Sequence, residues 1–96
     1  MVTISNIIQS STFAKQKRKL KKAQVKKLDE AIKTIMASPN IGDPKKGDLQ
    51  GIRVIKYKVG NNLIVLAYET EGSTLYLYSF GSHQNFYREL SKYLHH

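Results

Sequence analysis

The sequence predicts a single α+β domain, and three observations support this prediction. A short stretch of alternating apolar and polar residues opens the chain, a long segment without Gly or Pro follows it, and three runs rich in Ile, Val, Leu and Tyr come after a loop. A chain of 96 residues with 41% hydrophobic residues can bury one small core. We therefore expect an N-terminal strand, a helical hairpin, a three-stranded antiparallel sheet and a short C-terminal helix, in that order.

The N-terminal half is predicted to contain the first strand and both helices of the hairpin. Apolar and polar residues alternate over positions 2–7, which is typical of a short strand. Residues 10–12 are Ser-Ser-Thr, which are common N-cap residues, and positions 13–38 contain neither Gly nor Pro. The apolar residues of this segment form two stripes that point in different directions. A break at 21–24 would let both stripes face one core, so we expect two helices.

The C-terminal half is predicted to supply the sheet. Ser-Pro-Asn at 38–40 ends the second helix, because proline disfavours the helical conformation in the residue before it. Strands are expected at 52–59, 63–70 and 74–80, which are rich in β-branched and aromatic residues. The short links between them contain Gly, which tolerates the positive φ of hairpin turns, so the strands should be antiparallel. Apolar residues at helical spacing predict a closing helix from position 82 or 83 to 94.

The composition limits where the protein acts and what chemistry it performs. The chain has no Cys, which excludes disulfides, thiolate nucleophiles and cysteine zinc sites. Its first residues do not resemble a secretory signal, and no apolar run approaches the ~20 residues that a membrane helix needs. We therefore expect a cytoplasmic protein without a membrane partner. His95 and His96 are typical of the remnant of a purification tag, so the predicted domain spans 1–94.

Positive charge is concentrated in the predicted hairpin. The chain has 16 Lys and Arg residues against 7 Asp and Glu residues, a net charge of +9, which favours nucleic acid as a partner. Half of the basic residues lie between Lys15 and Lys27, where like charges four residues apart repel each other. Phosphate groups would relieve this repulsion, whereas the alternative is a solvated helix face. The candidate RNA-binding residues are Lys15, Lys17, Arg18, Lys19, Lys21, Lys22, Lys26, Lys45, Lys46 and Arg88.

Three further basic residues lie on the first long strand. Alternation places Lys56 and Lys58 on one face with Val54, and Arg53 on the other face with Ile55. If the helices cover the face of Arg53, the two lysines lie on an open face of the sheet. Such a face suits a phosphate group, and it is equally typical of an ordinary solvated sheet.

His83 follows a Gly-Ser turn at the predicted junction of the last strand and the closing helix. On its own, a histidine at this place is more often structural than catalytic. A helix N-terminus disfavours extra positive charge, however, and would keep the imidazole neutral and able to accept a proton. Tyr87 lies four residues later, on the same face of the predicted helix. If the last strand neighbours the first long strand or its hairpin partner, both groups could point toward Lys56 and Lys58.

These residues fit RNA cleavage without a metal. The acidic residues are scattered, so the sequence lacks the carboxylate cluster of a two-metal nuclease, and we predict no cofactor. In a metal-free reaction, a base takes the proton of a ribose 2′-OH, and that oxygen attacks the adjacent phosphate. Cations stabilise the developing charge, and an acid protonates the leaving 5′-oxygen. His83 and Tyr87 are the candidate proton-transfer groups, and Lys56, Lys58 and Arg53 are the candidate cations.

The chain resembles the RelE/ParE superfamily of toxins from bacterial type II toxin-antitoxin pairs in two segments, KKGDLQGIRVIKYKVGNNLIVLAYET and LYLYSFGSHQNFYREL, which follow a basic helical hairpin. The resemblance covers nearly the whole chain, and its most specific part is the Gly-Ser-His motif with the Phe-Tyr-Arg run. It implies a RelE/ParE-like fold. RelE-like members are ribosome-dependent endoribonucleases that cut mRNA in the decoding site, whereas ParE-like members poison DNA gyrase.

The resemblance also implies roles for individual residues and for partners. His83 is similar to the proton-transfer histidine of the YafQ-like branch, Tyr87 is similar to the C-terminal tyrosine of RelE-like enzymes, and Lys56 and Lys58 fall where that branch has basic residues. The arginine of the next strand would fall near Leu63 here, and a leucine cannot stabilise phosphate charge. The implied partners are a cognate antitoxin that covers the basic surface, mRNA and the ribosome.

Three functions follow from these observations. The first is an mRNA interferase of the RelE/YafQ kind, because a pair of proton-transfer groups has no use in gyrase poisoning. The second is a ParE-like inhibitor with DNA gyrase as its partner and no catalysis of its own. The third is a non-catalytic toxin homologue that binds nucleic acid, as Leu63 suggests.

Overall fold

The computed structural model describes residues 3–47 and 50–83 of the chain. Its elements confirm the predicted α+β class, with an N-terminal strand, a helical hairpin and three long antiparallel strands. The predicted closing helix lies outside the described residues, apart from its first positions. In chain order the elements are β1 (Asn6–Gln9), α1 (Ser11–Arg18), α2 (Lys22–Ala37), β2 (Asp43–Pro44), β3 (Arg53–Val59), β4 (Asn62–Glu71) and β5 (Thr74–Ser82).

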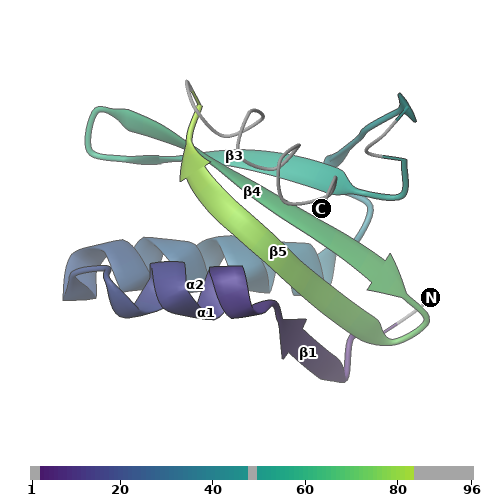
Figure 1. The fold of residues 1–96 in the computed structure, drawn as a ribbon. Coiled ribbons are helices and arrows are strands. Elements are labelled where there is room, and N and C mark those ends of the chain that lie inside the picture. Colours follow the sequence, from purple (N-terminus) through teal and green to yellow (C-terminus); the bar gives the residue numbers. More distant parts are fainter. Residues whose placement is uncertain (1–2, 48–49, 84–96) are drawn as a thin grey trace.

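The sheet is larger than the sequence predicts. It has five strands in the order β1-β5-β4-β3-β2, and β1 pairs in parallel with β5 while the other neighbours are antiparallel (Figure 1). The first strand begins at Asn6 rather than at position 2. A further strand, β2, forms where the sequence indicates only a loop, and its Pro44 is tolerated because β2 is an edge strand.

The helical hairpin forms as predicted, with its break slightly earlier in the chain. The Ser10 hydroxyl accepts a hydrogen bond from the Phe13 N–H at 3.0 Å and thereby caps α1. The break lies at residues 19–21 rather than at 21–24. Both helices lie on the same side of the sheet (Figure 1). No helix in the described part of the chain is long and apolar enough to cross a membrane.

The three long strands are joined by the two predicted hairpins. Gly60 and Gly72 have φ values of 61° and 60°, which the turns require and which side chains with a Cβ rarely adopt. Strand β5 ends at Ser82 rather than at Phe80, so Ser82 belongs to a strand and not to the predicted closing helix. His83 is the turn residue that directly follows this strand.

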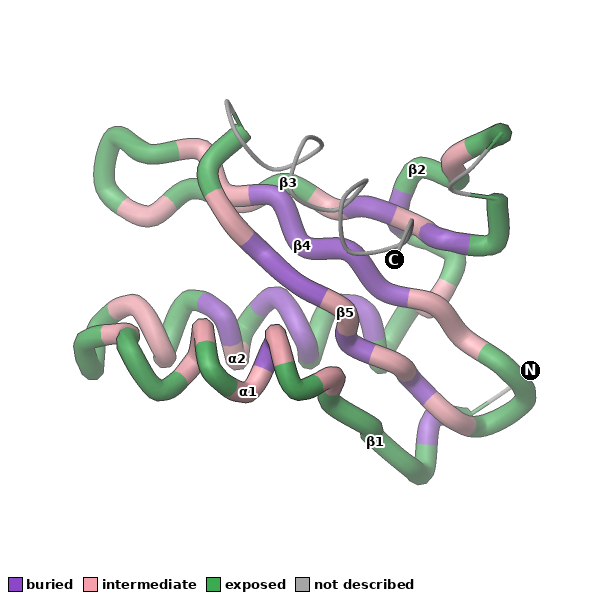
Figure 2. Tube along the Cα trace, in the orientation of Figure 1, coloured by how far each residue is buried: buried purple, intermediate pink, exposed green. Residues whose placement is uncertain are grey.

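The main core lies between the sheet and the helices. Figure 2 shows the buried stretches along β4 and β5 and on the helices. The rings of Phe13 and Phe80 meet edge to face, with centroids 5.3 Å apart. This packing holds α1 against β5. The buried residues of this core are Ile4, Phe13, Leu28, Ala31, Ile32, Ile35, Leu66, Tyr68, Leu75, Leu77 and Phe80.

The second face of the sheet has a core cluster of its own. Tyr78 packs against the buried residues Ile52, Val54, Val65 and Ala67. The prediction of an open face is therefore wrong for the centre of this face. Its apolar strand residues explain the difference, because a sheet face that carries Val and Ala at neighbouring positions gains free energy when it is removed from water.

Candidate functional site

One row of residues across three strands brings two of the predicted catalytic groups to the same face. Lys58 of β3 pairs with Leu63 of β4, and the His83 N–H donates to the Leu63 carbonyl at 3.1 Å. The register of β5 therefore continues through His83. Because neighbouring strands lie roughly 5 Å apart, the backbones of Lys58 and His83 are separated by roughly 10 Å.

The next row continues the same face. Lys56 pairs with Val65, and Val65 pairs with Gly81 of β5. Lys56 and Lys58 are both exposed, and His83 is exposed as well. The two lysines and the histidine thus occupy adjacent rows of one face, as the sequence predicts, and all three are accessible to a ligand.

The surface next to His83 is concave. A hollow of about 360 Å³ is lined by Asn61, Asn62, Leu63, Ser82 and His83. It lies where the β3–β4 turn meets the end of β5. Two asparagines, a serine and a histidine thus line the hollow together with the half-buried Leu63, which occupies the position between Lys58 and His83.

Arg53 is separated from the two lysines of its strand. Its Nη1 donates to the carbonyl oxygens of Gly42 at 2.8 Å and of Asn40 at 3.2 Å. Alternation along β3 places its side chain on the helix-facing side of the sheet. The structure therefore does not bring Arg53 together with Lys56 and Lys58, and the guanidinium instead holds the loop that follows α2.

Tyr68 holds the same loop from the core. Its hydroxyl accepts from the Gly42 N–H at 2.9 Å and donates to the Pro39 carbonyl at 2.8 Å. Burial is the main cause that raises the pKa of Tyr68, so the hydroxyl stays protonated and can donate. A Cβ at Gly42 would lie 2.7 Å from the Tyr68 oxygen, so a larger residue does not fit there.

This anchored loop leads to two of the predicted RNA-binding residues. The Lys45 N–H donates to the Ile52 carbonyl at 2.9 Å, and the Lys45 side chain is half-buried. Lys46 is exposed. Both lie beside β2, at the sheet edge opposite β1. Arg53 and Tyr68 thus anchor residues 39–42, which precede these two lysines in the chain.

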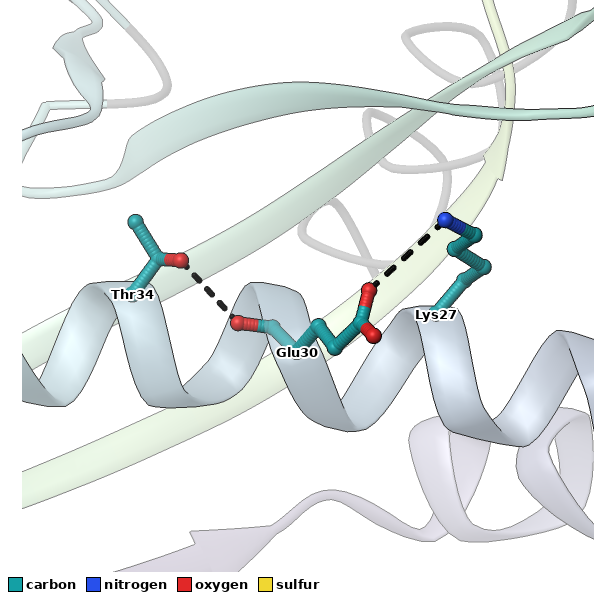
Figure 3. Close-up of polar contacts among 3 residues, drawn as sticks. All are labelled: Lys27, Glu30 and Thr34. Atoms are coloured by element: carbon teal, nitrogen blue, oxygen red, sulfur yellow. Dashed lines mark hydrogen bonds and ion pairs between the residues drawn. The ribbon is translucent and has the colours of Figure 1, made fainter.

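The helical hairpin presents most of its predicted cations to solvent. Lys17 is half-buried and lies 3.6 Å from Asp29 of α2. On α2, Lys27 lies 3.8 Å from Glu30, and the Thr34 hydroxyl donates to the Glu30 carbonyl (Figure 3). These two ion pairs offset only part of the positive charge. The exposed cations of the hairpin are Lys15, Arg18, Lys19, Lys21, Lys22, Lys26, Lys27 and Lys33.

The remaining predicted site residues, Tyr87 and Arg88, lie outside the described residues. Within residues 3–47 and 50–83, no group of three or more His, Asp and Glu side chains is arranged to hold a metal ion.

Comparison with known proteins assigns the chain to a family. Residues 7–91 match the family described as the ParE-like toxin of type II bacterial toxin-antitoxin systems. The chain belongs to this family. It is therefore a RelE/ParE superfamily toxin, as the sequence motifs indicate. No match to a curated protein sequence was found.

Solved structures of toxins share the fold of this ParE-like toxin. An E. coli RelE mutant in the free state is 16% identical over 96% of this chain and 98% of its own, with a TM-score of 0.68. YafQ from E. coli is 18% identical over 85% of this chain and 97% of its own, with a TM-score of 0.61. The toxin-antitoxin complex RelBE of E. coli gives 19% identity over 79% and 93% of the two chains, with a TM-score of 0.63.

Two residues that organise the toxin were not identified as important from the sequence. Tyr68 lies in an apolar strand, where a tyrosine is consistent with ordinary core packing. Gln16 lies among lysines, yet its side chain bonds to the backbone of Phe80. The signal for Gln16 is its position three residues after the buried Phe13, because a polar residue on the buried face of a helix needs a partner.

Proposed function

We propose that this toxin is a metal-independent, ribosome-dependent mRNA endoribonuclease that inhibits translation. The observation that carries the proposal is the row formed by Lys58, Leu63 and His83, with Lys56 in the adjacent row of the same face. His83 borders a concave surface, and the two lysines start from the same face of the sheet. A proton-transfer group with nearby cations is the set that cleavage of an RNA phosphodiester requires.

In the proposed reaction, the RNA supplies its own nucleophile. His83 takes the proton of the ribose 2′-OH, the 2′-oxygen forms a bond to phosphorus, and the bond from phosphorus to the 5′-oxygen breaks. Lys56 and Lys58 stabilise the negative charge on the phosphate oxygens during this step. Tyr87 donates a proton to the leaving 5′-oxygen. The products are a 2′,3′-cyclic phosphate and a free 5′-hydroxyl.

The spacing of the row suits one ribose phosphate. The backbones of Lys58 and His83 are roughly 10 Å apart, and both side chains start from the same face of the sheet. A lysine side chain spans about half of that distance, so its ammonium group can reach a phosphate that also lies beside the imidazole. Leu63 between them offers apolar contact to the ribose or base.

The cationic hairpin supports the proposal through non-specific RNA binding. Exposed lysines on α1 and α2, together with Lys45 and Lys46, can neutralise backbone phosphates and release counterions. Such binding weakens as the salt concentration rises. It holds mRNA without selecting a sequence, so we assign selection of the cut site to the ribosome. The proposed site of action is therefore the cytoplasm.

The proposed protein partner is a cognate antitoxin. The RelBE complex, whose toxin shares the fold, contains a toxin bound to its antitoxin. A net charge of +9 favours an antitoxin whose toxin-binding segment carries acidic residues. Such a segment would compete with RNA for the same cations.

A second candidate is a toxin that binds without cleaving. The observation that favours it is Leu63, because it leaves the central position of the row without a cation. Its target would be either nucleic acid or, as in ParE-like members of the superfamily, DNA gyrase.

The deciding experiment expresses the wild type, His83→Ala and His83→Asn without an antitoxin. We expect both variants to lose mRNA cleavage by at least 100-fold and to permit growth, because neither side chain transfers protons at neutral pH. Cleavage is measured by mapping mRNA 5′ ends, with toxin abundance measured in parallel. Growth arrest by His83→Ala that is as strong as wild type contradicts the proposal. A DNA damage response would then favour gyrase, and its absence would favour binding alone.

A further inference from the structure

We infer that Gln16 is a positioning residue for His83, because its amide group replaces a missing strand beside the end of β5. The catalytic consequence of this inference rests on the proposed RNA cleavage. The structural part rests only on contacts between α1 and β5.

Strand β1 covers only the first part of β5. Their parallel pairing runs from Asn6 with Thr74 to Gln9 with Leu77. Ser10 extends this edge, since its N–H donates to the Leu77 carbonyl at 3.0 Å and its hydroxyl donates to the Tyr78 carbonyl. The chain then turns into α1. Among the described residues, no strand lies beside β5 on this side beyond Tyr78.

Beyond Tyr78, the side chain of Gln16 bonds to the edge of β5 in place of a strand. Its Nε2 donates to the Phe80 carbonyl at 2.8 Å, and its Oε1 accepts from the Phe80 N–H at 3.0 Å. These are the two bonds that a neighbouring strand would make to the same residue. Only an amide side chain combines a donor and an acceptor in this arrangement, and asparagine is one methylene shorter.

Helix α1 holds Phe80 in two ways. The aromatic ring of Phe80 contacts the ring of Phe13, one helical turn before Gln16, and the backbone of Phe80 is bonded to Gln16 itself. Phe80 is only 8% exposed. Its position relative to α1 is thus fixed in both side chain and backbone.

His83 lies three residues after this anchor. On the opposite side of β5, the His83 N–H bonds to Leu63 of β4. The short segment from Phe80 to His83 is therefore held by β4 on one side and by Gln16 on the other. A strand end that is hydrogen-bonded on one side alone opens more readily than one bonded on both sides. Loss of the Gln16 side-chain amide should therefore loosen the segment from Phe80 to His83, which orients the imidazole.

Gln16 also links the two parts of the proposed site. It lies between Lys15 and Lys17 on the cationic helix, and it bonds to the strand that leads to His83. RNA phosphates bound along α1 would thereby be placed at a fixed distance from the imidazole. The inferred role is alignment of bound RNA with the reacting group.

The test compares Gln16→Met with Gln16→Glu and with the control Gln9→Met. Methionine matches the length of glutamine but cannot make either bond, whereas glutamate keeps an acceptor for the Phe80 N–H. Gln9 is an exposed amide residue on β1, outside the proposed site. We expect hydrogen exchange at the Phe80 amide to quicken at least tenfold in Gln16→Met. We also expect the ring signals of His83 to shift in nuclear magnetic resonance spectra, and Gln9→Met to leave both unchanged.

Cleavage kinetics distinguish a positioning role of Gln16 from a general loss of folded protein. For the folded fraction of Gln16→Met, kcat for mRNA cleavage should fall roughly 10- to 100-fold with little change in KM. Gln16→Glu keeps the bond to the Phe80 N–H but loses the bond to the Phe80 carbonyl. It should therefore retain slow exchange at Phe80 while still shifting the His83 signals and lowering kcat, each by less than Gln16→Met, and it serves as the test if Gln16→Met does not fold. Unchanged His83 signals, or a wild-type kcat, in the tested variant would overturn the inference. Absence of cleavage by the wild-type toxin would instead refute the proposed function, and the exchange and resonance measurements would still decide the positioning role.

Discussion

Strand β3 carries cations on both of its faces, and the two faces place them in different surroundings. On the helix-facing side, Arg53 donates to two backbone carbonyls of the loop that follows α2. On the second face, Lys56 and Lys58 extend into solvent, in rows that lead to the end of β5. A cation that is held by carbonyls has a structural role, whereas an exposed pair next to a histidine can serve a ligand. The two roles therefore lie on opposite faces of the same strand.

The same contrast extends to the other polar groups of the sheet. On the helix-facing side, the hydroxyl of Tyr68 bonds to Pro39 and Gly42. At the edge of β5, Gln16 bonds to both backbone groups of Phe80. Polar groups on this side therefore complete the fold, and mutations there should act mainly on stability or alignment. Mutations of the exposed cations on the second face should instead weaken RNA binding or slow RNA cleavage.

The largest expected effect of this contrast is on the helix-facing side. Tyr68→Phe removes a hydroxyl and leaves the Gly42 N–H and the Pro39 carbonyl without their partner. We expect the free energy of unfolding to fall by about 1–3 kcal/mol, because unsatisfied buried polar groups are costly. Urea denaturation measures this change. Tyr76→Phe, which removes a hydroxyl from a half-buried position on β5, is the matched control and should change stability by less.

The same variant also tests whether the two faces are independent. Per folded molecule, Tyr68→Phe should bind RNA as the wild type does, because its hydroxyl lies away from Lys56 and Lys58. A loss of RNA affinity without a loss of stability would show that the distinction between the faces is wrong.

The fold was largely predictable because its signals are local. Helix caps, the Pro at position 39 and the two glycine turns fix the ends of the main elements through short-range chemistry. Strand β2 was missed, because a pair of residues gives no periodic pattern and forms only by bonding to β3. The parallel pairing of β1 with β5 could not be predicted from local sequence signals either, because it joins segments that are far apart in the sequence.

The candidate site was predictable only in part. Alternation along β3 places Lys56 and Lys58 on one face and Arg53 on the other, and the structure has the same arrangement. The alignment of Lys58 with His83 depends on the register of three strands, which two turn types alone do not specify. The burial of Val54, Val65 and Ala67 was not foreseen, because alternation tells which residues share a face and not what covers that face.

A second prediction concerns the exposed lysines. Lys56→Ala combined with Lys58→Ala should weaken RNA binding roughly tenfold at physiological salt, or about 1.4 kcal/mol. The slope of log affinity against log salt should become shallower by about 1.4, since each lost phosphate contact on single-stranded RNA contributes about 0.7. The free energy of unfolding should stay within about 0.5 kcal/mol of wild type, because exposed side chains contribute little to it.

The control for this variant is Lys33→Ala on α2, which removes an exposed lysine from another surface. It should lower the binding free energy by clearly less than half of the loss caused by the double substitution on β3. A loss of half that size, which is the same loss for each lysine removed, would mean that RNA responds to net charge and not to this face of the sheet.

An effect confined to alkaline pH distinguishes Tyr57 from the lysines on either side of it in sequence. Tyr57 packs against the helix-side core, and burial raises its pKa to about 12. Tyrosines of the unfolded chain lose their proton near pH 10. Between these two values the unfolded state binds fewer protons than the folded state, so the free energy of unfolding falls as the pH rises from 10 to 12. Below pH 10 both states keep the proton, and the contribution is fully present.

Tyr57→Phe isolates this contribution, since the deprotonation of the lysines is common to both proteins. Urea denaturation at several pH values should show a constant difference between wild type and Tyr57→Phe below pH 10. Above it, the wild type should lose stability more steeply than the variant. Parallel curves throughout would mean that the Tyr57 hydroxyl is as accessible as the ammonium groups of Lys56 and Lys58, and the two faces of β3 would then not differ in their exposure to water.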